Sequence, residues 1–408
     1  MNFFSRKPAV KKKHSLFYRI SAWLHLWLGL ITGIVMLIVC VTACIWVFHD
    51  EITRLVEPET VIARQDKPVI TPSQVKEIAA AKYPGKKPGY VTYQQGTAIY
   101  LSLGEGRKGN TVMRLNPYTG QVISIKENKP GETDFFRFIL NGHRFLWMPS
   151  EIGRPIVNYS TLTFVIILIT GMVLWWPQKW TKATRDQSFK IKWKASFKRV
   201  NYDLHNVLGF YSLLIVLAMA LTGMVYGIKW YSKGLYWVTS GGQTLPDFKR
   251  PQSDSLQAGK LYTPEQAMDL VWGKVLSKHP EAEGFYYTFA DTSKPKSAIN
   301  ITIYPTAGKF YNNRSYAFDQ HTVQQLTGDK VFGISFQEAG VGAKLRKMNY
   351  DIHVGSILGL PGKILAFFGA LTGASLPVTG FLVWLGRKKK GKKGVGKKQQ
   401  TAKAFQAV

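Results

Sequence analysis

Long apolar runs alternate along this chain with longer stretches of mixed polar and apolar residues. Four of the runs are long enough to cross about 30 Å of hydrocarbon, which takes roughly 20 residues of helix. They cover residues 20–48, 156–176, 204–228 and 364–385. We therefore expect four membrane-spanning helices. The first run is not a cleaved signal, because its apolar part is far too long and no small-residue cleavage site follows it.

The mixed stretches predict small modules of helix and sheet. TPSQVKEIAAAKYPG at 71–85 predicts a capped amphipathic helix. The alternating stretches GYVTY, AIYLSL and TVMRLNPYTGQVISI that follow predict strands, with NPYTG as a turn. YTPEQAMDLVWGKVLSKHP at 262–280 begins a second copy, which NITIY and SYAFDQHTVQQLTG continue. Each long connection between spans is thus expected to form one small α+β module outside the membrane.

The distribution of charge predicts the orientation of the spans. The chain has 408 residues, 46% of them hydrophobic, and a formal net charge of +30. Of its 54 Lys and Arg residues, 23 lie in segments 1–19, 177–204 and 386–408, which together hold only two acidic residues. Basic residues accumulate on the cytoplasmic side, so both termini and the short middle loop are expected there. Because these basic runs flank spans, they indicate topology and contact with anionic membrane lipids, and no nucleic acid.

The predicted order of segments follows from the spans and the charges. It is a cytoplasmic basic tail (1–19), a span (20–48), an outer module (49–152), a span (153–176), a cytoplasmic loop (177–203), a span (204–228), an outer module (229–352), an outer segment with the fourth span (353–386), and a cytoplasmic basic tail (387–408).

A duplication links the two halves of the chain. RISAWLHLWLGLITGI around His25 and RVNYDLHNVLGFYSLL around His205 share an Arg, a Leu-His and a Leu-Gly at matching positions. NGHRFLW around His143 and NYDIHVGS around His353 precede the other two spans. Each histidine is followed, 17 residues later in the first pair and 26 or 27 in the second, by one of the dipeptides Thr42-Ala43, Thr222-Gly223, Thr170-Gly171 and Thr379-Gly380. We expect two copies of one unit, related by an axis along the membrane normal.

The spacing also gives each histidine a depth. Seventeen residues of helix rise about 25 Å at 1.5 Å per residue, which places His25 and His205 near the cytoplasmic side. The second and fourth spans run inward, so His143 and His353 are expected at the outer side. An imidazole in hydrocarbon requires a hydrogen-bond or metal partner. Two opposed neutral imidazoles are what a b-type haem requires as axial ligands, so the repeat predicts two haems, one near each face.

Other residues around these histidines support or compete with that hypothesis. Gly29 and Gly209 follow their histidines by four residues, on the same helical face, and Gly355 lies near the outer pair; all three could make room for a porphyrin ring. His49 could replace His143 or His353 as a ligand. Zinc is less suitable, because no cysteine or carboxylate lies close in sequence to complete a tetrahedral site. Cys40 and Cys44, the only cysteines, are expected to pack in the first span without chemistry.

The marks together resemble the PepSY-associated transmembrane family almost from end to end. They are the Thr-Pro-x-Gln helix starts, NPYTG, the four histidines and the Thr-Gly helix ends. The resemblance implies a bacterial inner-membrane protein, similar to di-haem ferrisiderophore reductases that pass electrons to iron in the periplasm. In such a protein the axial ligands would be His25, His205, His143 and His353. No GxGxxG follows a strand, so electrons must come from quinol or a separate cytoplasmic donor.

A ferric siderophore or another ferric chelate is the expected substrate, and it would meet the protein near the outer haem edge. Candidate contacts there are Arg144, Trp147, Trp230, Tyr231, Tyr236, Trp237, Arg346 and Lys347. Two other classes of function stay open. PepSY modules also resemble domains that bind or inhibit proteases, so the chain could be a membrane-anchored regulator without redox activity. A transporter fits poorly, because the spans hold no carboxylate and no broken-helix pair.

Overall fold

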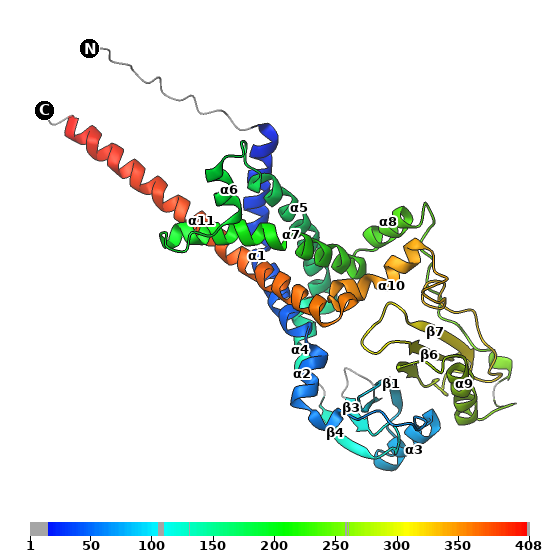
Figure 1. The fold of residues 1–408 in the computed structure, drawn as a ribbon. Helices are drawn as coiled ribbons and strands as arrows, with labels where there is room; N and C mark the ends of the chain where they lie inside the picture. Colours follow the sequence, from blue (N-terminus) through cyan, green and yellow to red (C-terminus); the bar gives the residue numbers. More distant parts are fainter. Residues whose placement is uncertain (1–14, 105–109, 130, 258, 260, 406–408) are drawn as a thin grey trace. The chain divides into compact units, whose positions relative to one another are not determined.

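Four long apolar helices dominate the computed structural model, which describes residues 15–104, 110–129, 131–257, 259 and 261–405, with side chains as far as residue 386. They are α1 (Leu16–Trp46), α5 (Ser150–Trp175), α7 (Phe197–Gly227) and α11 (Leu360–Phe405), whose part Leu360–Gly386 is long and apolar enough to span (Figure 1). The four predicted spans are thus confirmed as apolar helices. Most of the predicted basic tail 1–19 lies outside the described residues, while α11 continues as a helix to Phe405.

Shorter helices and strands fill the connections. The helical elements are α2 (His49–Val56), η1 (Pro58–Thr60), α3 (Pro72–Lys82), α4 (Phe135–Phe145), α6 (Lys182–Phe189), α8 (Lys229–Thr239), η3 (Ser255–Gln257), α9 (Pro264–Lys278), α10 (Val341–His353) and η4 (Ser356–Leu358). The strands are β1 (Pro88–Gln94), β2 (Ile99–Gly104), β3 (Asn110–Leu115), β4 (Val122–Asn128), β5 (Gly284–Thr288), β6 (Ala298–Tyr304) and β7 (Arg314–Asp319).

Local sequence explains where the two amphipathic helices begin. Thr71 caps α3 and Thr263 caps α9, each accepting from the backbone N–H three residues on, where Gln74 or Gln266 completes a capping box. A proline follows each threonine at the first helical position, where its missing N–H costs nothing. Both helices are therefore confirmed near their predicted starts.

The strands form one sheet instead of the two separate sheets that the repeat suggested. Its order is β4-β3-β2-β1-β5-β6-β7, and all neighbours are antiparallel. The first strands of the two copies pair with each other, from Tyr90 opposite Thr288 to Gln94 opposite Gly284. A lone copy would leave this edge open, and pairing the two edges satisfies their backbone groups. The two modules are thus halves of one seven-stranded structure.

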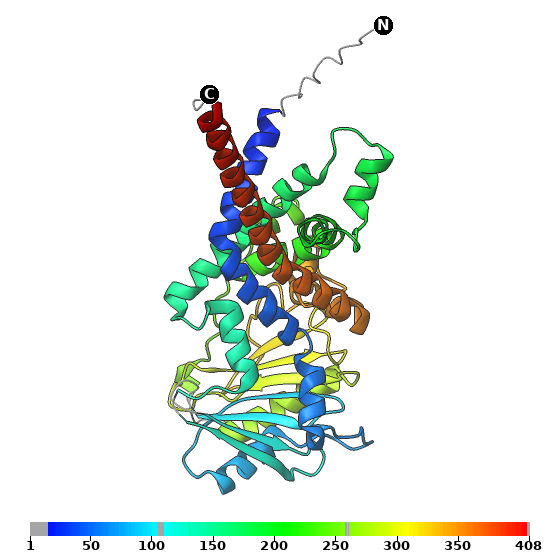
Figure 2. The ribbon, with the colours of Figure 1, turned by 90° about the vertical axis from the view of Figure 1, so that its left-hand side faces the viewer.

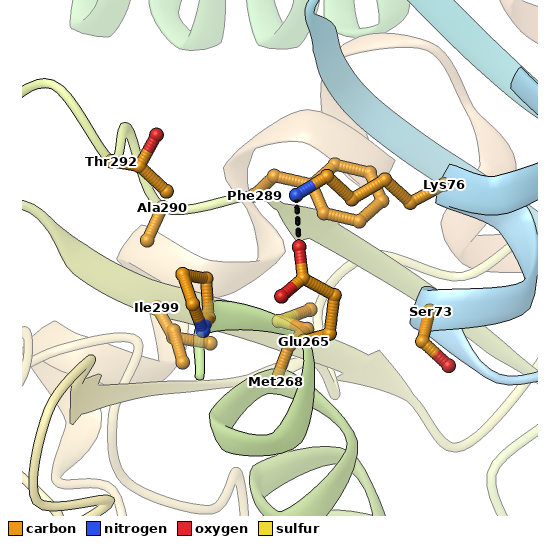
Figure 3. Close-up of a pocket in the computed structure, with 9 residues that line it drawn as sticks. Ser73, Lys76, Glu265, Met268, Phe289, Ala290, Thr292 and Ile299 are labelled. Carbon is orange, nitrogen blue, oxygen red and sulfur yellow. Dashed lines mark hydrogen bonds and ion pairs between the residues drawn. The ribbon is translucent and has the colours of Figure 1, made fainter. Parts of the chain in front are cut away.

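The main apolar core lies between this sheet and the two amphipathic helices, which cover one of its faces (Figure 2). Val75, Val271 and Trp272 of the helices pack on strand residues such as Leu101 and Ile301. The helices also bond to each other: Lys76 of α3 donates to Glu265 of α9 at the edge of a small hollow (Figure 3). Ser73 donates to the carboxylate of Asp269. Contacts between the two copies therefore extend from the strands to the helices.

The chain divides into two compact units. Unit 1 comprises Met1–Cys44, Gly142–Leu221 and Phe367–Val408, and unit 2 comprises Ile45–Asn141 and Thr222–Ala366. Apolar residues from all four long helices form the core of unit 1, among them Met36, Phe164, Val216 and Ala374. Cys40 is buried in this core against α11, where a Cβ at Gly373 would lie 3.0 Å from its sulfur. Its packing matches the prediction that the cysteines are structural.

Candidate functional site

Two of the four candidate histidines meet inside unit 1. The ring of His25 on α1 and the ring of His205 on α7 have centroids 6.1 Å apart, with planes inclined at 85°. The helices that carry them belong to different halves of the chain. The predicted facing of the inner pair is therefore present in the structure. His143 lies in unit 1 and His353 in unit 2.

Every candidate histidine turns Nδ1 toward a threonine on the other long helix of its own half. The Nδ1 of His25 lies 3.4 Å from Oγ1 of Thr170, and that of His143 lies 3.3 Å from Oγ1 of Thr42. In the second half, His205 pairs with Thr379 at 2.9 Å and His353 pairs with Thr222 at 3.1 Å. The four contacts use the four threonines whose spacing marked the repeat.

These contacts determine which ring nitrogen carries the proton. The hydroxyls of Thr42, Thr170 and Thr379 donate to carbonyl oxygens one turn earlier in their own helices. Their oxygens can then only accept, so the histidine Nδ1 must be the donor. Nδ1 of His25 also donates to the Ile167 carbonyl and Nδ1 of His143 to the Val39 carbonyl, each at 3.0 Å. With the proton on Nδ1, Nε2 keeps its lone pair, which is the form that binds a metal.

A small residue follows each of these threonines and lets the imidazole lie close to the helix. A Cβ at Gly171 would be 3.0 Å from Cε1 of His25, and one at Gly380 would be 3.1 Å from Cε1 of His205. The same distance separates a Cβ at Gly223 from Cε1 of His353. The fourth position is Ala43, beside Thr42. The Thr-Gly dipeptide is thus a seat for a histidine ring, formed by one acceptor and one missing side chain.

The second half adds an asparagine to each seat. Asn201, one turn before His205, donates to the Thr379 carbonyl at 3.0 Å. Asn349, one turn before His353, donates to the Thr222 carbonyl at 3.1 Å. Both asparagines are buried. Sequence reasoning missed them, although the five-residue pattern NYDxH occurs at 201–205 and again at 349–353 and could have revealed them.

The aspartate of the same pattern is fully buried in both places and anchors a neighbouring loop. Asp203 accepts from the backbone N–H of Lys192 and from Arg199. Asp351 accepts from the backbone N–H groups of Phe310 and Tyr311, at 2.9 and 2.6 Å, and from the Ser356 hydroxyl. Burial raises the pKa of the Asp351 carboxyl, while these donors oppose the rise. NYDxH therefore combines a histidine with two residues that position its surroundings.

The three glycines predicted to make room for a ring differ in their surroundings. A Cβ at Gly29 would meet no protein atom within 4 Å, and one at Gly209 would lie 3.5 Å from Leu376. Gly355 has a different explanation: its φ is +78°, which favours glycine, and a Cβ there would meet the Gly362 carbonyl. The turn after α10 therefore accounts for Gly355 without a ring.

The competing histidine, His49, has partners of its own. It begins α2, and its Nδ1 lies 2.9 Å from a carboxylate oxygen of Asp50. Its ring packs against Trp46 and Phe136, with centroid distances of 5.0 and 4.3 Å. These contacts are all within unit 2 and account for its position without a metal.

The predicted substrate contacts are not equally accessible. Trp230 and Trp237 of α8 are more than half exposed, whereas Tyr236 is buried. Lys347 is only 2% exposed and donates to the Asn313 carbonyl at 2.8 Å, under the ring of Phe332. Its burial lowers the pKa of the ammonium group to about 8. Lys347 is therefore a buried structural lysine and not a surface contact.

Among the described residues, no three His, Cys, Asp or Glu side chains gather closely enough to hold a bare metal ion. The histidines instead occur singly, each on its threonine. A family model described as the PepSY-associated TM region matches residues 22–387, which include all four histidine seats. The chain belongs to the PepSY-associated TM family. No curated protein matches it.

Membership of the PepSY-associated TM family agrees with the four apolar helices, and it identifies a membrane protein. The family match begins in α1 just before His25 and ends in α11 just after Thr379. The seats therefore lie within the part of the chain that defines the family.

Proposed function

We propose that this chain is a di-haem b electron-transfer protein of the bacterial inner membrane, which reduces a ferric chelate in the periplasm. The observation that carries the proposal is the four-fold repetition of one seat, in which a threonine and a small residue orient a histidine on a neighbouring helix. A structural histidine needs a hydrogen bond, but nothing in packing requires the same nitrogen to be bonded four times. A metal ligand does require it.

The inner pair fits the demands of a shared metal. Bonds of about 2 Å from a first-row metal to each Nε2 would hold two imidazole centroids about 6 Å apart. The centroids of His25 and His205 are 6.1 Å apart. The open space beside Gly29 is consistent with a flat ring there. His25 and His205 would hold the inner haem, and His143 and His353 would hold the outer one.

The protein's residues would hold and orient these groups, and the apolar helices around them would exclude water. Haem, when bound, supplies reversible one-electron transfer. Threonine hydroxyls and helix carbonyls on Nδ1 fix each imidazole's tautomer and make Nε2 a better ligand. The basic termini and middle loop support a cytoplasmic location for the inner pair, where quinol or a separate donor would supply electrons.

Reduction changes the affinity of the chelate for iron. Hard oxygen ligands hold ferric iron more tightly than ferrous iron, so one electron weakens the chelate without any acid or base from the protein. This chemistry requires only that the chelate lie close to the outer pair. It agrees with the absence of a three-residue metal cluster among the described residues.

The test is the haem content of the purified full chain, expressed with haem precursor supplied. We expect a red protein with a b-type spectrum and about two haems per chain. After reduction by a quinol analogue, addition of a ferric chelate should restore the oxidised spectrum. A colourless protein would contradict the proposal and favour the membrane-anchored regulator.

A further inference from the structure

The four central strands of the sheet contain no charged residue. β1, β2, β5 and β6 have the sequences PGYVTYQ, IYLSLG, GFYYT and AINITIY. One face of these strands packs on α3 and α9. The other face carries hydroxyl groups where an ordinary solvent-facing sheet would carry Lys and Glu. We call its six central residues, Tyr90, Thr92, Tyr100, Tyr286, Thr302 and Tyr304, the tyrosine face.

The rings of the tyrosine face contact one another across strands. Tyr90 lies 5.8 Å from Tyr100 of β2 and 5.8 Å from Tyr286 of β5, measured between ring centroids. Thr92 stands between the last two, opposite Tyr100 on one side and Tyr286 on the other. All six residues are partly exposed. Burial nevertheless raises the pKa of the Tyr286 phenol, so this hydroxyl remains a neutral donor.

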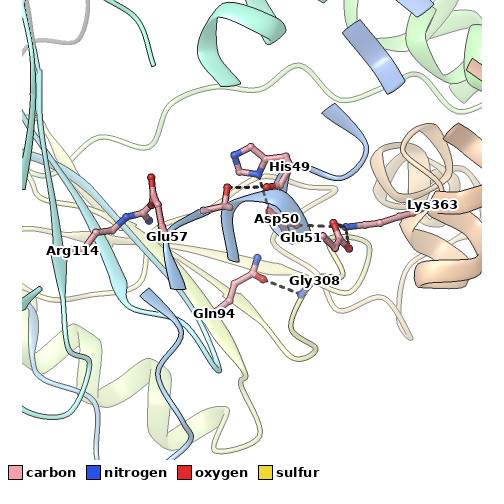
Figure 4. A network of polar contacts seen from close by, with 9 residues as sticks. His49, Asp50, Glu51, Glu57, Gln94, Arg114, Gly308 and Lys363 are labelled. Carbon is pink, nitrogen blue, oxygen red and sulfur yellow. Dashed lines mark hydrogen bonds and ion pairs between the residues drawn. The ribbon is translucent and has the colours of Figure 1, made fainter. Parts of the chain in front are cut away.

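The flanking charge nearest this face is neutralised. Arg114 of β3 lies over the ring of Tyr100 at 4.8 Å, and it pairs at 3.1 Å with Glu57 just after α2 (Figure 4). An approaching ligand therefore meets aromatic rings and hydroxyl donors with no net charge.

A row of rings joins the tyrosine face to the helix that carries His353. Tyr304 lies 5.4 Å from Phe310, and Phe310 lies 4.7 Å from Tyr350 of α10, three residues before His353. The loop that holds Phe310 is fixed at both ends. Asp351 accepts from the Phe310 N–H, and Gln94 of β1 accepts from the Gly308 N–H at 3.2 Å (Figure 4).

We infer that the tyrosine face is the docking site for a neutral ferric chelate of the hydroxamate type. This inference rests on the proposed function for its purpose, since the bound Fe³⁺ would gain one electron, supplied by the quinol or cytoplasmic donor, to become Fe²⁺. Stacking on the rings and hydrogen bonds from phenols to the chelate's oxygens would hold it. The ring row places this site next to the outer ligand His353.

Charge decides between chelate classes. Singly charged hydroxamates neutralise Fe³⁺ in their tris complex, whereas doubly charged catecholates leave a tris complex strongly anionic. A trianion requires Lys or Arg partners to offset its lost hydration. None of the four central strands contains such a residue. The face therefore selects the neutral complex.

Binding can be measured without reduction by using Ga³⁺ chelates, since Ga³⁺ has the charge of Fe³⁺ but is not reduced. We would titrate the full chain in detergent calorimetrically with a Ga³⁺ tris-hydroxamate and a Ga³⁺ tris-catecholate. The hydroxamate should bind more tightly. Tyr286→Ala should weaken it about tenfold, and Tyr286→Phe less, because the ring remains. Tyr262→Ala, at an exposed tyrosine outside the strands, is the matched control and should change nothing.

Thr92→Lys provides a second test that does not remove a ring. It places a cation at the centre of the tyrosine face and should increase affinity for the catecholate while decreasing affinity for the hydroxamate. Equal affinities of the unchanged chain for both chelates would overturn the inference. So would equal effects of Tyr286→Ala and Tyr262→Ala.

The outcomes separate this site from the proposed function. A chain without haem that binds the Ga³⁺ hydroxamate through Tyr286 would refute the reductase and retain the docking site. A chain that reduces ferric chelates, but whose Ga³⁺ binding is unchanged by all these variants, would retain the reductase and refute the docking site.

Discussion

The first and second halves of the chain agree at the histidine seats and differ in what supports them. Both halves place each histidine Nδ1 on a threonine of a partner helix. The second half adds Asn201 and Asn349, whereas the corresponding positions in the first half are Ser21 and Ile139. The orientation of the ring has thus been kept through divergence, and its supporting bonds have not. This pattern is expected when the ring performs the chemistry.

The largest effect that can test the comparison is loss of one ligand. His25→Ala and His205→Ala should each reduce haem content from about two to about one per chain, because either change leaves the inner site with a single axial ligand. A pyridine haemochrome assay per mole of protein measures this. His279→Ala, at a histidine bonded to Tyr316 outside the spans, is the control and should keep both haems. Unequal losses at His25 and His205 would break the equivalence of the halves.

Filling a seat should act next most strongly. Gly380→Leu and Gly171→Leu place side-chain atoms where Cε1 of His205 or His25 lies, at about 3 Å from the new Cβ. The ring must move away, and inner-site haem should fall below half occupancy. Gly234→Leu is the control, since a Cβ there meets no atom within 4 Å. Full haem content in Gly380→Leu would show that the glycine does not seat the ring.

The buried lysine of the second half makes a prediction about pH. Lys347 stands six residues before His353 and is buried, while Arg137 stands six residues before His143 and is exposed. The pKa of Lys347 is lowered to about 8 in the folded chain, from its ordinary 10.5. Between these values the unfolded chain holds a proton that the folded chain has released. The free energy of unfolding should therefore rise from pH 8 to pH 10.5, by up to about 3 kcal/mol.

Thermal melting of the protein in detergent at pH 7 to 10 measures that rise in stability. Lys347→Met should remove most of the pH-dependent rise, and the exposed counterpart variant Arg137→Met should leave it intact. An identical pH profile for wild type and Lys347→Met would assign the rise to other groups.

The smallest predicted effect concerns the asparagines. Asn201→Ala removes the hydrogen bond to the Thr379 carbonyl and should cost about 1 kcal/mol, with haem loss to a haem-scavenging protein about five times faster. Ser21→Ala changes the equivalent first-half position and should have less effect. Stopped-flow transfer of haem to apomyoglobin compares the two variants. A faster loss from Ser21→Ala would reverse the asymmetry between the halves.

The amino-acid sequence predicts the elements of this molecule better than their connections. The four spans, the capped helices and the facing of His25 with His205 follow from periodicity, capping residues and spacing. The single sheet does not, because a pattern of strands cannot show which edge pairs with which. The threonines were visible as repeat marks, yet their bonds to Nδ1 depend on how helices distant in sequence pack. Asn201 and Asn349 were hidden for the same reason.

The seam between β1 and β5 has a consequence for origin and assembly. Matching strands of two similar halves run in opposite directions there, which is the arrangement that two identical copies related by a two-fold axis would make. One half alone would present an open strand edge suited to a second molecule of itself. The present chain therefore has the geometry of a fused homodimer, in which covalent linkage has made the two partners free to diverge.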